Sequence, residues 1–160
     1  MIVGQLALCL SLVTAALSVP TRESELDGRC LFVLQTEVAH VTAEELCAAE
    51  GAVLAARVTS AEYDLLKAAG SGAGNNYLHI GLKQKTDQPT PLDGWQWHID
   101  GYLFEAGNIG WTSGEPNDEY NTPDINKENC GTLVPHITPL VNDAACTTLL
   151  GRPLCQLKSG

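Results

Sequence analysis

The chain has 160 residues, of which 44% are hydrophobic and 18% are charged, and its net charge is −10. This length suits one domain, or one domain with a leader, and the hydrophobic fraction is sufficient for a folded core. A chain this acidic repels both the phosphate backbone and anionic lipid surfaces. The composition therefore argues against a nucleic-acid partner and against binding to an anionic membrane.

The N-terminus carries an apolar run, residues 2–17, that contains no charge. The run is too short for a comfortable membrane span, and the small residues Ala16 and Ser18 form a cleavage pattern at its end. These features predict a signal peptide at residues 1–18, followed by a short extension at 19–29 and a secreted domain at 30–160. We expect no membrane insertion of the mature chain.

Export places the cysteines in an oxidising compartment, where they form disulfides. Loss of the leader removes Cys9 and leaves an odd number, so at least one cysteine stays free or pairs with another chain. The cysteines that remain are Cys30, Cys47, Cys130, Cys146 and Cys155. The four histidines match no zinc spacing and are assigned to structural or surface positions. They are His40, His79, His98 and His136.

In chain order, the first predicted element is a short strand at residues 31–34, an apolar run. Two capping-box patterns follow, at residues 42–45 and 59–62, where Thr is followed three positions later by Glu. Each pattern predicts the start of a helix, and Gly51 and Gly70 predict where these helices end.

The second half of the chain contains short strands and many turn residues. Residues 77–82 predict a buried strand, and residues 95–97 alternate so that both Trp side chains share one face and pack in the core. Further strands are predicted to begin at residue 133 and to cover 154–157. Helices early and strands late indicate an α+β domain, whose long irregular region is typical of functional loops.

Acidic residues are concentrated between Asp87 and Asp143. This window holds ten carboxylates and one cation, Lys127, and so accounts for −9 of the net charge of −10. Part of this charge is explained by a solvated acidic surface. Carboxylates that pack together repel one another unless a cation lies among them, and oxygen ligands without sulfur suit Ca²⁺.

Three short segments within this window carry side-chain oxygens close to cysteines: residues 115–118, 128–130 and 142–143. Asn and Asp are also common turn formers, which is the alternative interpretation of any one segment. Together the three loops supply the carboxylate and amide oxygens that a seven- or eight-coordinate Ca²⁺ needs.

The ordered motifs from Cys30 to Leu157 resemble the C-type lectin-like domain. They are Cys47, Ile80-Gly81-Leu82, Gly94-Trp95-Gln96-Trp97, Asp100-Gly101, Trp111, Gly114-Glu115-Pro116-Asn117, Glu128-Asn129-Cys130, Asn142-Asp143, Cys146 and Leu154-Cys155. The resemblance implies an α+β fold with two helices packed on small antiparallel sheets and a long Ca²⁺-binding loop region. It also implies disulfides Cys47–Cys155 and Cys130–Cys146.

The resemblance also implies a site. The principal Ca²⁺ and carbohydrate ligands would be Glu115, Asn117, Glu128, Asn142 and Asp143, with the backbone carbonyl of Asp143 included. An auxiliary Ca²⁺ site would use Asp87, Asp93, Asp118, Glu128 and Asn129, where Asn129 stands at a position that is Asp in many members. Pro116 matches a position that follows a cis peptide bond in the family.

The function implied is that of a secreted, Ca²⁺-dependent lectin. The Glu-Pro-Asn triplet at residues 115–117 is associated with mannose-type sugars (mannose, N-acetylglucosamine, glucose and fucose), whose vicinal hydroxyls coordinate Ca²⁺. The partners would be glycans on microbial or cell surfaces, as in innate recognition. The alternative is a Ca²⁺-dependent protein-binding or mineral-matrix module on the same fold without sugar binding.

No catalytic motif is present, and a Ca²⁺-bound carboxylate is held ionised, so we expect no enzyme. The chain departs from the family at Val141, where Trp is common, and in a longer loop at 119–127. Cys30 has no upstream partner once the leader is removed. One hypothesis is a disulfide-linked homodimer through Cys30, and a free or capped thiol is the other.

Overall fold

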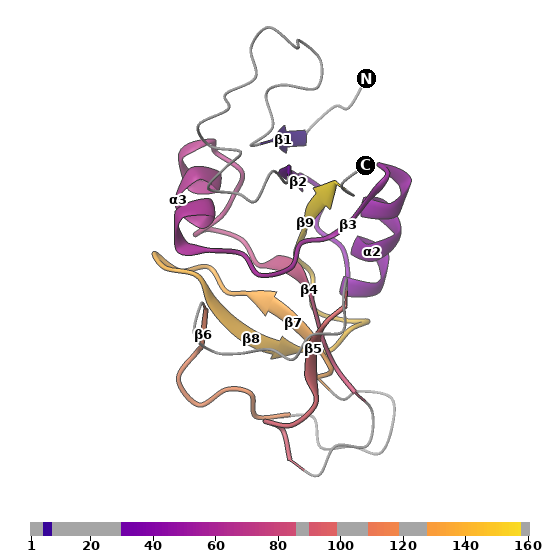
Figure 1. Ribbon diagram of the computed structural model, residues 1–160, viewed down its shortest axis with the longest axis vertical. Coiled ribbons are helices and arrows are strands. Elements are labelled where there is room, and N and C mark those ends of the chain that lie inside the picture. The colour runs from indigo at the N-terminus through magenta and orange to yellow at the C-terminus, as the bar shows by residue number, and fades with distance from the viewer. Residues whose placement is uncertain (1–4, 8–29, 86–89, 99–108, 119–127, 158–160) are drawn as a thin grey trace, which may run out of the picture.

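A computed structural model describes residues 5–7, 30–85, 90–98, 109–118 and 128–157. Two helices lie on either side of the upper half of a mixed sheet of nine strands (Figure 1). The helices are α2 (His40–Ala49) and α3 (Ser60–Ala68). The strands are β1 (Gln5–Ala7), β2 (Leu31–Leu34), β3 (Ala52–Leu54), β4 (Leu78–Gln84), β5 (Trp95–Trp97), β6 (Gly110–Trp111), β7 (Cys130–Leu133), β8 (Leu140–Ala144) and β9 (Arg152–Leu157).

The α+β prediction is confirmed. The strands, however, form one mixed sheet rather than several small antiparallel sheets. The strand order is β1-β2-β9-β4-β7-β8-β6, with β3 paired to β9 and β5 paired to β4. The β4–β9 and β6–β8 pairs are parallel. Strand β4 has neighbours on both sides and its first five residues are buried, as expected for a strand covered on both faces.

The two helices begin for different reasons. Thr59 and Glu62 form the predicted capping box of α3, in which Glu62 N–H donates to Thr59 Oγ1 (3.2 Å) and Thr59 N–H donates to Glu62 Oε1 (2.8 Å). The predicted cap of α2 at Thr42 is wrong, because the N-cap is Ala39, three residues earlier, and it makes no side-chain capping bond. The buried His40 ring lies 2.8 Å from the carbonyl of Ile80, so a contact with β4 fixes the first turn.

Two disulfides join the elements in the pairs that the resemblance implies. Cys47–Cys155 links α2 to β9, and Cys130–Cys146 links β7 to the residues that follow β8. Cys30 is in a disulfide in the chain that still carries residues 1–18. The inter-chain bond through Cys30 concerns the chain without its leader and stays a hypothesis.

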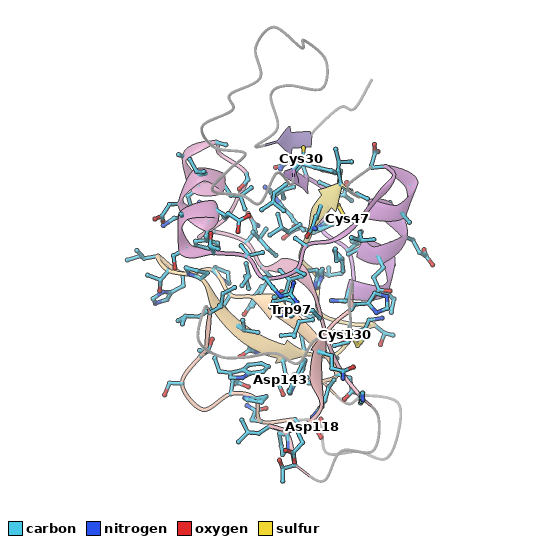
Figure 2. The ribbon with its side chains drawn as sticks, in the orientation of Figure 1. Cys30, Cys47, Trp97, Asp118, Cys130 and Asp143 are labelled. Carbon is cyan, nitrogen blue, oxygen red and sulfur yellow. A yellow bond between two sulfur atoms is a disulfide. The ribbon has the colours of Figure 1, made fainter. Side chains whose placement is uncertain are left out.

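Strand β1 lies within the predicted leader and pairs antiparallel with β2, Leu6 opposite Val33. Cleavage of residues 1–18 remains a prediction. At the same end of the molecule Leu157 N–H donates to Cys30 O (3.0 Å). Asp118 lies at the opposite end (Figure 2). In the part of the chain that the structure describes, no helix is long and apolar enough to cross a membrane.

The core prediction for the Trp residues is confirmed. Trp95 and Trp97 on β5 are each 4% exposed, and the Trp111 ring contacts that of Trp95 edge-on at a centroid distance of 4.9 Å. Val141, at a position where Trp is common in the resembling family, is fully buried opposite Trp111 and Leu133. The Val141 side chain, although smaller than Trp, is therefore shielded from solvent.

His40 and His79 pack against each other inside the structure, at a centroid distance of 5.3 Å. Both are fully buried, whereas His98 and His136 are exposed. The assignment of all four to structural or surface positions is confirmed.

Candidate functional site

The structure brings the three oxygen-bearing segments together at the lower end of the sheet. Asp118 and Asp143 mark this place in Figure 2. The first segment is a turn that follows β6: Thr112 N–H donates to Val141 O (2.8 Å), and Glu115 N–H donates to Thr112 O (2.9 Å). These bonds hold the turn against β8 through its backbone.

The third segment was predicted as a loop and is instead part of strand β8. Asn142 lies opposite Thr132, and Asp143 lies opposite Gly131, in the antiparallel β7–β8 pair. The pairing sets these two residues beside Cys130, the last residue of the second segment. The register of a strand pair, rather than a turn, therefore positions two of the five principal residues.

Asp118 connects all three segments. Its backbone N–H donates to Asp143 Oδ2 (2.8 Å), and its carboxylate Oδ1 accepts from Glu128 N–H (3.2 Å). Asp118 has φ +49°, a conformation that Asp adopts more readily than most residues. We refer to these two hydrogen bonds as the Asp118 contacts. Sequence reasoning placed Asp118 only in an auxiliary metal site, and no pattern in the sequence indicates this connecting role.

The amide groups of the site face oxygen atoms of their neighbours. Asn117 Nδ2 donates to Glu115 Oε1 (2.9 Å), and Asn142 Nδ2 donates to the carbonyl of Asp143 (2.9 Å). The bond between Glu115 and Pro116 is cis, as the resemblance implies. The predicted residues therefore form two adjacent amide–oxygen pairs.

The carboxylates of this site are electrostatically strained. Burial, then the hydrogen bond and charge of Asp143 and the charge of Glu128, raise the pKa of Glu115 to about 7, against a smaller lowering by the Asn117 N–H. Glu128 is 8% exposed and Asp143 is 1% exposed. Like charges in a desolvated site raise carboxyl pKa values in this way, and a cation removes the cause.

Two oxygens of the site have no donor. Glu115 Oε2 and Asp143 Oδ1 are buried, and with both carboxylates ionised neither has a donor among the described residues. Only a proton on one of the two carboxyl groups allows the hydrogen bond between them that raises the pKa of Glu115. Buried unpaired oxygens are costly, which fits a place where an ion would bind. Within the described residues no three His, Cys, Asp or Glu side chains are grouped as a metal site. The implied set contains three carboxylates, Glu115, Glu128 and Asp143, and without the ion these three are not grouped closely enough to count as such a site.

The residues of the auxiliary set are only partly placed. Asp87 lies outside the described residues. Asp93 Oδ2 accepts from the Thr90 hydroxyl (2.8 Å), and Asn129 O accepts from Gln84 N–H (2.9 Å). No described contact joins Asp93 to Asp118 or Glu128, so the auxiliary site stays a prediction.

Comparison with known proteins gives matches in structure but not in sequence families. No protein-family model matches the sequence, and no curated protein matches it. Among solved structures, the C-type lectin domain of murine dendritic cell inhibitory receptor 2, in complex with N-glycan, is 24% identical with a TM-score of 0.61. The match covers 82% of this chain and 91% of that domain.

Two further solved structures show the range of proteins that share this architecture. The cow C-type carbohydrate-recognition domain of CD23, in the presence of GlcNAc2Man3 oligosaccharide, is 21% identical with a TM-score of 0.61, covering 82% of this chain and 89% of that one. A Ca²⁺-dependent type II antifreeze protein in its Ca²⁺-free form is 23% identical with a TM-score of 0.56, covering 82% and 94%. The chain thus has the fold of the C-type lectin-like domain, as its ordered motifs predict.

Proposed function

We propose that this protein is a secreted, Ca²⁺-dependent lectin that binds mannose-type sugars, and not an enzyme. The observation that supports it most is the pair of buried, donor-free oxygens on Glu115 and Asp143. They adjoin the buried Glu128 in a site where burial, and then the neighbouring carboxylates of Asp143 and Glu128, raise the pKa of Glu115 to about 7. Carboxylate and amide oxygens are the ligands that Ca²⁺ takes in proteins. In this proposal residues 1–18 are a leader and 30–160 the lectin domain.

The principal Ca²⁺ would be held by Glu115, Asn117, Glu128, Asn142 and Asp143. When bound, the ion supplies open coordination positions that two vicinal sugar hydroxyls fill in place of water. The carboxylates of Glu115 and Glu128 accept hydrogen bonds from those hydroxyls, and the amides of Asn117 and Asn142 donate to them. Because the donors and acceptors come in two pairs, the site favours two neighbouring hydroxyls on one sugar.

The structural neighbours support a glycan as the ligand class, since two of them were solved with an N-glycan or a mannose-containing oligosaccharide. The antifreeze protein has a similar fold, so the fold by itself leaves the ligand open. The Glu-Pro-Asn triplet at 115–117 is the feature of this chain that favours mannose-type sugars over galactose.

Affinity chromatography tests the proposal directly. The purified protein is applied in millimolar Ca²⁺ to immobilised mannose and, in parallel, to immobilised galactose, and each column is then washed with chelator. We expect retention on mannose, release by chelator and no retention on galactose. Failure on both columns, with Ca²⁺ binding still detected by calorimetry, would favour the protein- or mineral-binding alternative.

A further inference from the structure

A small cavity of ≈ 140 Å³ opens on the outer face of the β4–β5 hairpin. It is separate from the site formed by residues 115–118, 128–130 and 142–143, which we call the oxygen-rich site. Side chains alternate along a strand, so Lys83 and Lys85 share one face, and the register places Gln96 opposite Lys83. His98 N–H extends the pairing by donating to Gly81 O (2.7 Å). The cavity is lined by Lys83, Gln84, Lys85, Gln96, Trp97 and His98.

The charge of this cavity is opposite to that of the chain. None of the described residues that line it is acidic, although the chain has 19 acidic residues. Two of the five Lys and Arg residues in the described part of the chain line it. Lys85 and His98 are exposed, and no contact of their side chains with another described residue is found. The opening therefore presents the ammonium group of Lys85 with no carboxylate among the described lining residues to pair with it.

Glu44 partly balances the cavity, because it forms an ion pair with Lys83. Burial acts to raise the pKa of Glu44, but hydrogen bonds from His40 and Lys83 and the charge of Lys83 lower it to about 2. Glu44 thus stays ionised and cancels the charge of Lys83. The N–H groups of Lys83 that do not contact Glu44 remain able to donate hydrogen bonds. The net positive charge of the cavity therefore comes from Lys85.

The size of the cavity limits what can enter it. Pockets for drug-sized ligands measure roughly 300–1,000 Å³, so this one admits a single small substituent rather than a sugar ring. Gln84 N–H, at this edge, donates to the carbonyl of Asn129, the residue after Glu128. A chain-like ligand could therefore place a substituent here while extending toward the oxygen-rich site.

We propose that the cavity binds the sulfate or carboxylate group of an acidic glycan through Lys85, Gln96 and His98. The net charge of −10 opposes non-specific attraction of polyanions, so binding of one would need a local cationic site. The proposal does not depend on Ca²⁺, and the two sites can be tested separately.

The test is isothermal titration calorimetry in chelator, which removes any contribution of the proposed Ca²⁺ site. The probes are a heparin-derived tetrasaccharide for sulfate, tetragalacturonate for carboxylate and neutral maltotetraose. We expect at least one acidic probe to bind and maltotetraose not to bind. The acidic probe that binds identifies which group the cavity takes.

A matched pair of variants locates the binding. Lys85→Gln should weaken the acidic probe about fivefold, the effect of losing one exposed ion pair. Lys67→Gln makes the same charge change on α3 and should leave the affinity unaltered. The proposal is overturned if neither acidic probe binds, or if both variants weaken binding equally.

Discussion

The backbone N–H of Asp118 lies 2.8 Å from Asp143 Oδ2, so a residue of the first loop fixes the side chain of a residue on β8, 25 positions along the chain. Asp118 also accepts from the backbone of Glu128 through its own carboxylate. The two bonds orient residues that we propose as Ca²⁺ ligands. Loss of groups that orient ligands in this way commonly lowers metal affinity by about 10- to 100-fold.

Two substitutions separate orientation by Asp118 from direct metal binding. Asp118→Ala removes the acceptor for Glu128 N–H and puts Ala at φ +49°, so Ca²⁺ affinity should fall by about tenfold. Asp118→Asn keeps an acceptor oxygen and tolerates the same backbone angle. We expect it to retain most of the affinity measured by calorimetry, and amide exchange of Glu128 should be fast only in the Ala variant. Equal losses in both variants would instead assign Asp118 a charge-dependent role as a ligand.

Calcium should stabilise the folded chain. At a Ca²⁺ concentration of about 100 times the Kd, binding adds roughly 2.7 kcal/mol to the free energy of unfolding. Thermal melts with Ca²⁺ and with chelator measure this difference. Asp143→Asn removes the charge of one of the two carboxylates that carry a donor-free oxygen, and the melting temperature of this variant should depend much less on Ca²⁺. A wild-type melting temperature that is the same in millimolar Ca²⁺ and in chelator contradicts the proposed site.

The pH dependence of stability should carry a contribution from His79. Burial and the neighbouring His40 lower its pKa to about 4, against smaller opposing effects of the carbonyls of Val38 and Leu149. Because the folded value lies below the unfolded value of about 6.5, the folded state favours the neutral ring. The stability that His79 contributes is fully present above pH 6.5. It is lost as the pH falls from 6.5 through 4, and the total loss in the free energy of unfolding is on the order of 3 kcal/mol.

Chemical denaturation at several pH values, in wild type and in His79→Gln, tests this expectation. The variant keeps a donor for the carbonyl of Val38, which the His79 ring contacts at 2.8 Å, but does not titrate. Its stability should therefore fall less than that of wild type between pH 6.5 and pH 4. Parallel curves for the two proteins would show that His79 does not titrate differently on unfolding.

The two disulfides should have separable effects. Cys47–Cys155 closes a loop of 108 residues, and Cys130–Cys146 closes one of 16. Replacing the first pair by Ser should cost more stability, on the order of 4 to 5 kcal/mol against about 3 for the second. Replacing the second pair should reduce Ca²⁺ affinity more, because it joins the residues next to Glu128 and Asp143. Denaturation and calcium titrations on both variants show whether the two losses separate.

A close approach between β3 and β4 predicts a sensitive glycine. A Cβ at Gly81 would lie 2.6 Å from the carbonyl oxygen of Leu54, a backbone atom that cannot turn away. Gly81→Ala should therefore destabilise the fold by about 1–3 kcal/mol. Gly110→Ala is the control, since no atom lies within 4 Å of its added Cβ. Similar melting temperatures for the two variants would mean that the strands separate at little cost.

The sequence was informative where local chemistry decides the structure. The Thr59 capping box, the alternation of Trp95 and Trp97 and the order of the motifs led to the correct helix, strand and fold. It was uninformative where distant contacts decide: β3 and β6 were not predicted, and Asn142 and Asp143 lie in a strand. The start of α2 at His40 depends on a hydrogen bond to a residue 40 positions away, and tertiary contacts override local propensity in such cases.

The candidate site follows the same division. Its residue types were identifiable because oxygen-bearing side chains recur beside cysteines. The Asp118 contacts and the cavity on the β4–β5 hairpin could not be identified from the sequence, because both depend on backbone conformation and on which strands lie side by side. Lys83 and Lys85 are ordinary surface residues in the sequence, and only the β4–β5 hairpin groups them with Gln96 and His98.

The hydrogen bond between Leu157 and Cys30 joins the two ends of the domain on the side away from Asp118 (Figure 2). A tag, a surface linker or a neighbouring domain attached after residue 157 would therefore leave the oxygen-rich end facing solution. Several copies fixed to a common support through this end would present their sites outward in parallel. Weak individual contacts could then combine on a repetitive surface such as a polysaccharide coat.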